Sequence, residues 1–139
     1  MTEAQAKEAL AARWDAAWPA ASSPASVPFT LANEAFTPPA SAALFAALWH
    51  GGLAERQLTM GPIGARRFEY RGALNVRLFG PVDDGEARLA TLAVAVRTVL
   101  ASQTIGGALW TAGAASAPAR LGAWWTVTLT VPYRFYDRR

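Results

Sequence analysis

Few side chains in this sequence could carry out catalysis. His50 is the only histidine and cysteine is absent, so a nucleophile activated by an imidazole would depend on His50 alone. His50 ends an apolar run and precedes two glycines, which favours a structural role. The sequence also lacks the glycine-rich turns that hold phosphates or dinucleotides, and the serine elbow of hydrolases. We therefore expect a protein that is not an enzyme and that uses no cofactor.

One group of carboxylates has the chemistry of a metal site. Asp83, Asp84 and Glu86 follow Pro81 and directly precede a helical pattern. Such side chains accept hydrogen bonds from the first backbone amides of a helix, and their charge suits the positive end of the helix dipole. Hard cations also bind carboxylates. Because capping already accounts for the cluster, we expect no metal site.

The clearest pattern lies between residues 66 and 79 and has a period of two. Its apolar side chains are Phe68, Tyr70, Leu74, Val76 and Leu78. Its polar side chains are Arg67, Glu69, Arg71, Asn75 and Arg77. The alternation predicts a strand with one face on the core and the other exposed. We take the polar face as the candidate site, because alternating charges can pair across a subunit boundary. An ordinary solvated face explains the pattern equally well. Gly72 interrupts the apolar side and predicts a bulge or bend.

A nucleic-acid-binding module is a second explanation of this strand. The stretch RGALNVRLF partly matches the strand signature of RNA-recognition domains. However, Ala73 and Asn75 occupy the exposed positions at which aromatic rings would stack on bases. The net charge of +3 permits contact with a polyanion without requiring it, and the longest run of basic residues is two arginines.

The remaining patterns predict one α+β domain over residues 1–139. We expect a mainly antiparallel, mixed sheet with two helices packed on one face. The first predicted element is a helix over 2–18, capped by Thr2 and Gln5 and ended by Pro19. A second helix is predicted over 85–101. The predicted strands are 29–34, 42–50 (with helix as the alternative), 105–111 and 124–135, and we expect a hairpin arm or loop over 51–65 and a loop over 112–122.

The sequence gives no indication of a membrane segment. Charged residues interrupt the first eighteen positions, as they would not in a signal peptide. No uncharged apolar run approaches the roughly 20 residues that span a bilayer. We expect assembly in a cytoplasm, without membrane contact.

The order of these features resembles the small tail-terminator-like proteins of tailed bacteriophages and of gene-transfer-agent-like particles. The resemblance runs from Val27 onward and rests on VPFTLANEAFTPP, RQLTMG, RGALNVRLFGPVDDG and VPYRFYD. None of these stretches is a catalytic motif. The sequence departs from the family pattern at 42–49, which is richer in alanine.

This resemblance implies a structural virion protein. Proteins of this type form a ring, commonly a homohexamer, on the head-proximal end of the tail tube, where the ring stops tube polymerisation and meets the head. The implied partners are copies of the same chain, the tail tube protein and a head-completion or neck protein, with DNA only passing through the lumen. The polar face would then meet a neighbouring subunit or line the lumen. The alternatives are another head–tail connector component and a small nucleic-acid-binding module.

Overall fold

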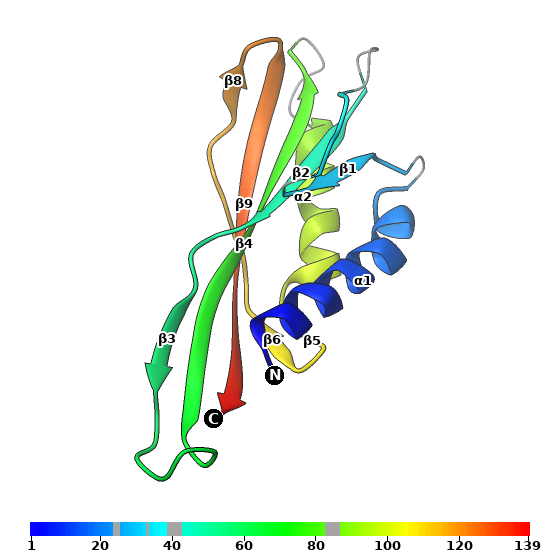
Figure 1. Ribbon diagram of the computed structural model, residues 1–139. Helices are drawn as coiled ribbons and strands as arrows, with labels where there is room; N and C mark the ends of the chain where they lie inside the picture. Colours follow the sequence, from blue (N-terminus) through cyan, green and yellow to red (C-terminus); the bar gives the residue numbers. More distant parts are fainter. Residues whose placement is uncertain (24–25, 33, 39–42, 83–86) are drawn as a thin grey trace.

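The computed structural model describes residues 1–23, 26–32, 34–38, 43–82 and 87–139 (Figure 1). The described residues form two helices and one sheet, so the protein is α+β. The helices are α1 (Glu3–Ala21) and α2 (Ala87–Leu100). The strands are β1 (Phe29–Leu31), β2 (Phe45–His50), β3 (Ala54–Gln57), β4 (Arg67–Pro81), β5 (Gln103–Ile105), β6 (Ala108–Trp110), β7 (Ala114–Ala115), β8 (Ala119–Leu121) and β9 (Trp124–Arg138).

The sheet is organised around β4 and β9. These two strands of 15 residues each pair antiparallel, from Arg67 opposite Arg138 to Pro81 opposite Trp124. The main path of the sheet is β1-β2-β4-β9-β6-β5, with β3 on β4 and with β7 and β8 on β9. The parallel pair β1–β2 makes the sheet mixed, whereas its other pairs are antiparallel.

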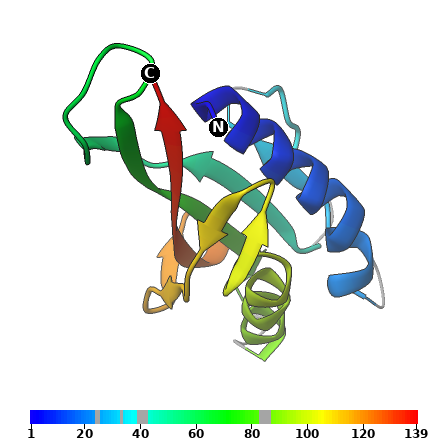
Figure 2. The same cartoon turned by 90° about the horizontal axis from the view of Figure 1, so that it is seen from below.

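Both helices lie on one side of this sheet (Figure 2). The core fills the space between the helices and the sheet. The side chains that the period-two pattern assigned to the core do face the helices: Leu74, Val76 and Leu78 are at most 1% exposed. From β9, Leu129 and Val131 join them, and α2 contributes Leu89, Leu92, Val96, Val99 and Leu100. The alternation in β4 and β9 therefore predicts the core face correctly.

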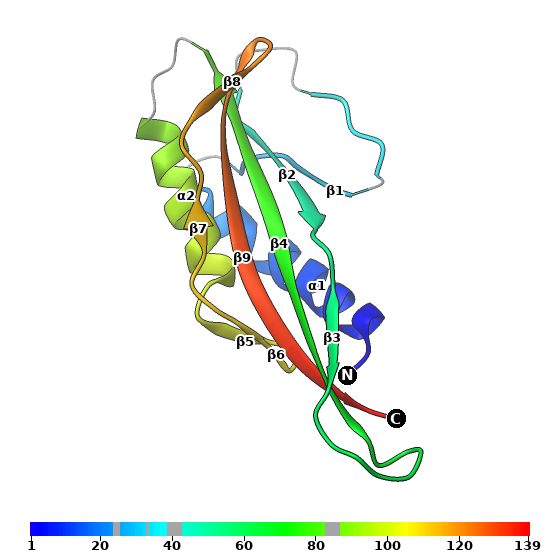
Figure 3. The same ribbon diagram turned by 90° about the vertical axis from the view of Figure 1, so that its left-hand side faces the viewer.

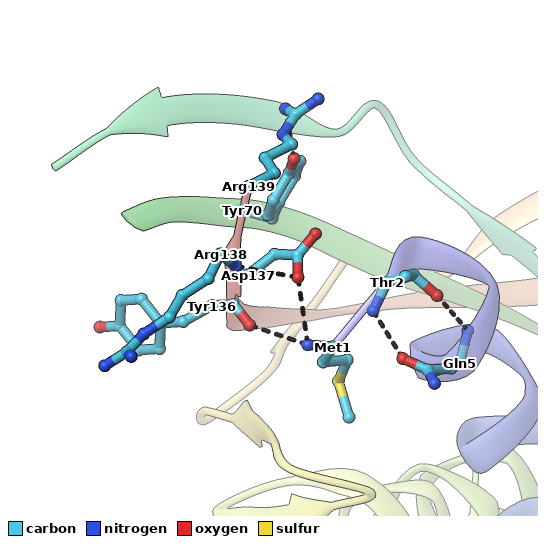
Figure 4. Close-up of polar contacts among 8 residues, drawn as sticks. All are labelled: Met1, Thr2, Gln5, Tyr70, Tyr136, Asp137, Arg138 and Arg139. Atoms are coloured by element: carbon cyan, nitrogen blue, oxygen red, sulfur yellow. Dashed lines mark hydrogen bonds and ion pairs between the residues drawn. The ribbon is translucent and has the colours of Figure 1, made fainter. Parts of the chain in front are cut away.

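Helix α1 begins as predicted and ends later. Thr2 and Gln5 form the expected capping box, with Gln5 N donating to Thr2 Oγ1 over 3.3 Å and Thr2 N donating to Gln5 Oε1 over 2.8 Å (Figure 4). Pro19 does not end the helix, which continues to Ala21. Trp18 holds this last turn in place: its side chain is buried, and its Nε1 donates to Val27 O over 2.7 Å. Tertiary packing thus extends the helix past the proline.

Three further predictions can be compared with the described residues. The strand β2 confirms a strand, not a helix, at the end of the 42–50 segment. The single strand expected over 105–111 is a hairpin of β5 and β6, because Gly106 and Gly107 both have positive φ, of 59° and 95°, as a tight hairpin turn requires. The loop expected over 112–122 contains β7 and β8, which pair with β9. The carboxylates Asp83, Asp84 and Glu86 lie outside the described residues.

The segment expected as an arm or loop contains β3, which pairs with the N-terminal part of β4 (Figure 3). Strands β3 and β4 and the end of β9 extend past both helices, together with the loop 58–66. We call this projection the arm: residues 54–71 and 134–138. On its helix side, the Met1 amine donates to Tyr136 O over 3.2 Å (Figure 4). On the same side, the rings of Tyr70 and Phe135 stack at 4.9 Å. Among the described residues, no helix is long and apolar enough to cross a membrane.

We expect Leu89→Ala in α2 to lower the free energy of unfolding by about 2–5 kcal/mol, because the truncation leaves a cavity beneath the helix. Val94→Ala on the exposed side of α2 is the matched control and should change it by less than about 0.5 kcal/mol. Urea denaturation followed by circular dichroism measures both. Equal losses would contradict the position of α2 on the sheet.

Candidate interaction face

The outer face of the sheet is the side opposite the helices, and it carries the candidate residues. The β4–β9 register places Arg67 opposite Arg138 and Arg71 opposite Arg134. Between these rows, Glu69 lies opposite Tyr136 on one side and Arg56 of β3 on the other. Five arginines therefore surround one carboxylate at the arm end of this face. We call them the arginine cluster: Arg56, Arg67, Arg71, Arg134 and Arg138.

Glu69 is buried, not exposed as the period-two pattern predicted. Its residue surface is 4% exposed, because the neighbouring side chains fold over it. Arg71 Nε donates to Glu69 Oε1 over 2.7 Å, Arg56 pairs with the same oxygen at 3.4 Å, and Tyr136 Oη donates to Oε2 over 3.2 Å. The hydrogen bond from Arg71 is the main cause that lowers the pKa of Glu69, and burial opposes it. A strand pattern cannot predict this, since the covering groups come from three strands.

The remaining members of the cluster differ in their partners. The Arg67 guanidinium lies over the Tyr136 ring, 4.4 Å from its centre. Among the described residues, the side chains of Arg134 and Arg138 have no hydrogen-bond or ion-pair partner, and both residues are exposed. The cluster thus holds more positive charge than its single carboxylate balances.

Asn75 and Arg77 belong to a separate part of the outer face. Thr130 Oγ1 donates to Asn75 Oδ1 over 2.9 Å. Arg77 Nε donates to Thr128 Oγ1 over 3.2 Å, and its guanidinium lies over the Trp49 ring at 5.4 Å. Both residues are half-buried by these cross-strand contacts. The prediction of one continuous exposed face is therefore wrong: only Arg67 and Arg71 of the five candidates are exposed.

The far end of the outer face is closed by aromatic rings. Phe45 and Phe79 stack at 4.3 Å, and Trp124 meets Phe45 edge-on at 4.8 Å. Phe36 contacts Phe45 at 5.6 Å. These contacts leave Phe45 only 5% exposed. The arm end is therefore the charged and open part of this face.

Gly72 lies where the arm joins the body, and it forms no bulge. The β4–β9 register continues without interruption through Gly72 opposite Tyr133. A Cβ at Gly72 would lie 2.8 Å from Tyr133 Oη, closer than real contacts allow. The glycine is needed because the tyrosine ring crosses over it. The register thus contradicts a bulge, and the alternative of a bend stays a prediction.

His50 lines a cleft of about 150 Å³ between α1 and the sheet, beside Lys7, Trp14 and Leu48. Its Nδ1 lies 3.4 Å from Tyr133 Oη. Burial, and then the charge of Lys7, lower the pKa of His50, while burial raises the pKa of Tyr133. Near neutral pH the two groups are thus an uncharged ring and a protonated phenol. In the described part of the chain, no three His, Cys, Asp or Glu side chains gather as metal ligands would.

The loop at the tip of the arm exposes apolar side chains. Met60 is 93% exposed and Ile63 is 88% exposed, and Leu58 is also exposed. Sequence reasoning missed them, because a loop has no periodicity by which an apolar residue can be assigned to core or surface.

Comparisons with known proteins support the fold only. No family model matches the chain, and no curated protein sequence is similar to it. Solved structures do match, among them one known only by a sequence identifier, with a TM-score of 0.65 and 20% sequence identity. That alignment covers 92% of this chain and 94% of the solved chain. At this identity the likeness shows a shared fold and says nothing of function.

The pKa of Glu69 is lower in the folded state than in the unfolded state, where it is near 4.5. At a pH above the unfolded pKa, the ionised carboxylate therefore stabilises the folded protein. This stabilisation is lost as the pH falls through the folded pKa. The melting temperature of the wild type should decrease as the pH falls from about 5 to about 3. We expect this decrease to be smaller in the variant Glu69→Gln. Thermal melts over this range measure the effect. The same steep decrease in the variant would show that Glu69 is not held by its arginines.

Proposed function

We propose that the protein is a tail terminator, a structural virion protein that forms a ring at the head-proximal end of a phage-type tail tube, ends tube polymerisation and joins the tube to the head. The sequence resemblance supports this proposal through the order of its motifs, and the α+β fold is compatible with it. The partners would be further copies of the chain, the tail tube protein and a neck protein.

The observation that carries the proposal is the exposed apolar tip of the arm. In an isolated subunit, the side chains of Met60 and Ile63 are exposed to water. Burial of each side chain in a subunit contact would contribute roughly 1.5–3 kcal/mol of favourable free energy. The tip projects beyond both helices, so no part of the body can cover it (Figure 3). Contiguous apolar surface that is exposed marks sites of contact with another protein, and we infer that the tip makes such a contact.

The body offers a surface that such a tip could enter. A hollow of about 350 Å³ lies between the end of α1, the start of β2 and α2, and Val27, Pro28, Leu44 and Leu92 supply its apolar walls. The starts of β2 and α2, which border this hollow, lie at the end of the molecule opposite the arm tip (Figure 1). A contact between two different surfaces of the same chain repeats head to tail, and it closes into a ring if the rotation per subunit divides a full turn.

Termination in this scheme needs no reacting group. One surface of the ring would match the end of the tail tube, and the opposite surface would present a different geometry that cannot template another tube ring. Growth then stops because the next tube subunits find no complementary surface. The role is compatible with a chain whose one histidine is half-buried beside a tyrosine.

We expect the double variant Met60→Ser/Ile63→Ser to remain monomeric, at 14.8 kDa, where the wild-type chain forms a ring of roughly six times this mass. The melting temperature of the monomer should not change, since neither side chain packs in it. Size-exclusion chromatography with light scattering, with and without tail tube protein, measures the assembly. The control is Val94→Ser/Leu121→Ser, which removes two other exposed apolar side chains. Loss of the ring in both variants, or a wild-type chain that stays monomeric with tube protein present, would contradict the arm contact.

A second measurement tests termination itself. Addition of the purified protein to polymerising tail tube protein should shorten the tubes and place extra density at one end, as seen by electron microscopy. A different neck component would leave the tube length unchanged and bind the portal end of filled heads. That result would replace the terminator role with the connector role.

A further inference from the structure

The arginine cluster concentrates the charge of the protein in one place. Its five arginines and Glu69 together carry a formal charge of +4, whereas the whole chain carries +3. All other side chains therefore sum to −1. The helix side of the same arm differs, because there Arg139 pairs with Glu55 and stacks on Phe68. The positive charge of the cluster lies on the outer face only.

The register of β4 and β9 opposes like charges twice. Arg67 lies directly across from Arg138, and Arg71 across from Arg134. Like charges in such positions destabilise a sheet. Glu69 pairs with Arg71 and with Arg56 of β3, so its single charge does not balance the other opposed pair, Arg67 and Arg138. A bound polyanion would balance the positive charge that Glu69 leaves over.

We propose that the arginine cluster binds the phosphate backbone of duplex DNA. The guanidinium fork matches phosphate oxygens in pairs. The two opposed pairs lie about 13 Å apart along the strands, since four residues separate Arg67 from Arg71. Across the strands, the Cα atoms of each pair lie about 5 Å apart. Such a grid can contact several phosphates together, and Arg71 and Arg134 also border an open hollow of about 330 Å³.

Duplex DNA fits this face better than a single strand or an acidic protein. A single strand needs aromatic rings on which its bases stack. The ring at this end of the face, that of Tyr136, lies under the guanidinium of Arg67. Arginine is common in protein interfaces, but the Asp and Glu side chains that an acidic partner would have to supply for this cluster are depleted there. A narrow β ribbon that presents arginines matches a surface of regularly repeated negative charge.

This inference rests on the charge and register of one subunit and does not require the ring. If the ring forms as proposed, the cluster gives the passing DNA a sequence-independent contact that releases with salt. If no ring forms, the phosphate contact is still measurable on the monomer.

The experiment measures the binding of a short labelled DNA duplex of mixed sequence by fluorescence anisotropy at several salt concentrations. With about four phosphate contacts, the wild-type affinity should fall roughly a hundred-fold between about 50 and about 200 mM salt. The variant Arg134→Gln/Arg138→Gln leaves the contacts of Glu69 intact. It should bind more weakly and lower the magnitude of the salt slope by about two. Its melting temperature should be unchanged or higher, because opposed like charges are removed.

The matched control is Arg97→Gln/Arg120→Gln, which removes two exposed arginines from α2 and β8. The proposal expects this control to bind like the wild type. An equal loss in both variants would overturn it, since net charge alone would then explain binding. Tighter binding of single-stranded DNA, equal competition by polyglutamate, or no binding at low salt would overturn it too. Chromatography of the same samples reports the ring separately.

Discussion

Fifteen consecutive residue pairs join β4 to β9, and they fix which side chains face the helices and which face outward. A shift of one residue would exchange the two sets, exposing core positions such as Val76 and Leu129 and burying the arginines. The core that α1 and α2 cover thus enforces the register. The register in turn assembles the arginine cluster at the other end of the same two strands.

The two strands are longer than the core that they support. Near α2 their inner face is buried, whereas the arm has no helix over it and depends on local contacts. The stacked rings of Tyr70 and Phe135 extend the core onto the inner side of the arm. On its outer side, Glu69 links β4 to β3 and β9 through its contacts with Arg56 and Tyr136. These contacts join the three strands of the arm, which carries both the apolar tip and the charged face.

The two proposals use different parts of the arm and different physics. The tip would contribute the burial of apolar surface that a subunit contact needs. The free energy of this burial does not depend strongly on salt. The arginine cluster would contribute electrostatic contact with a polyanion, which salt weakens. The two proposed contacts would therefore respond differently to salt.

Local sequence patterns identified the features that are set by residues close together in the chain. Period-two alternation identified the core faces of β4 and β9, and the capping residues identified the start of α1. The same patterns could not show that Pro19 lies inside a helix or that Glu69 is buried. Nor could they show that Arg56 of β3 and Arg134 and Arg138 of β9 lie beside Arg67 and Arg71. The physical reason is that burial and charge balance depend on the register between strands far apart in the chain, which alternation within one strand cannot encode.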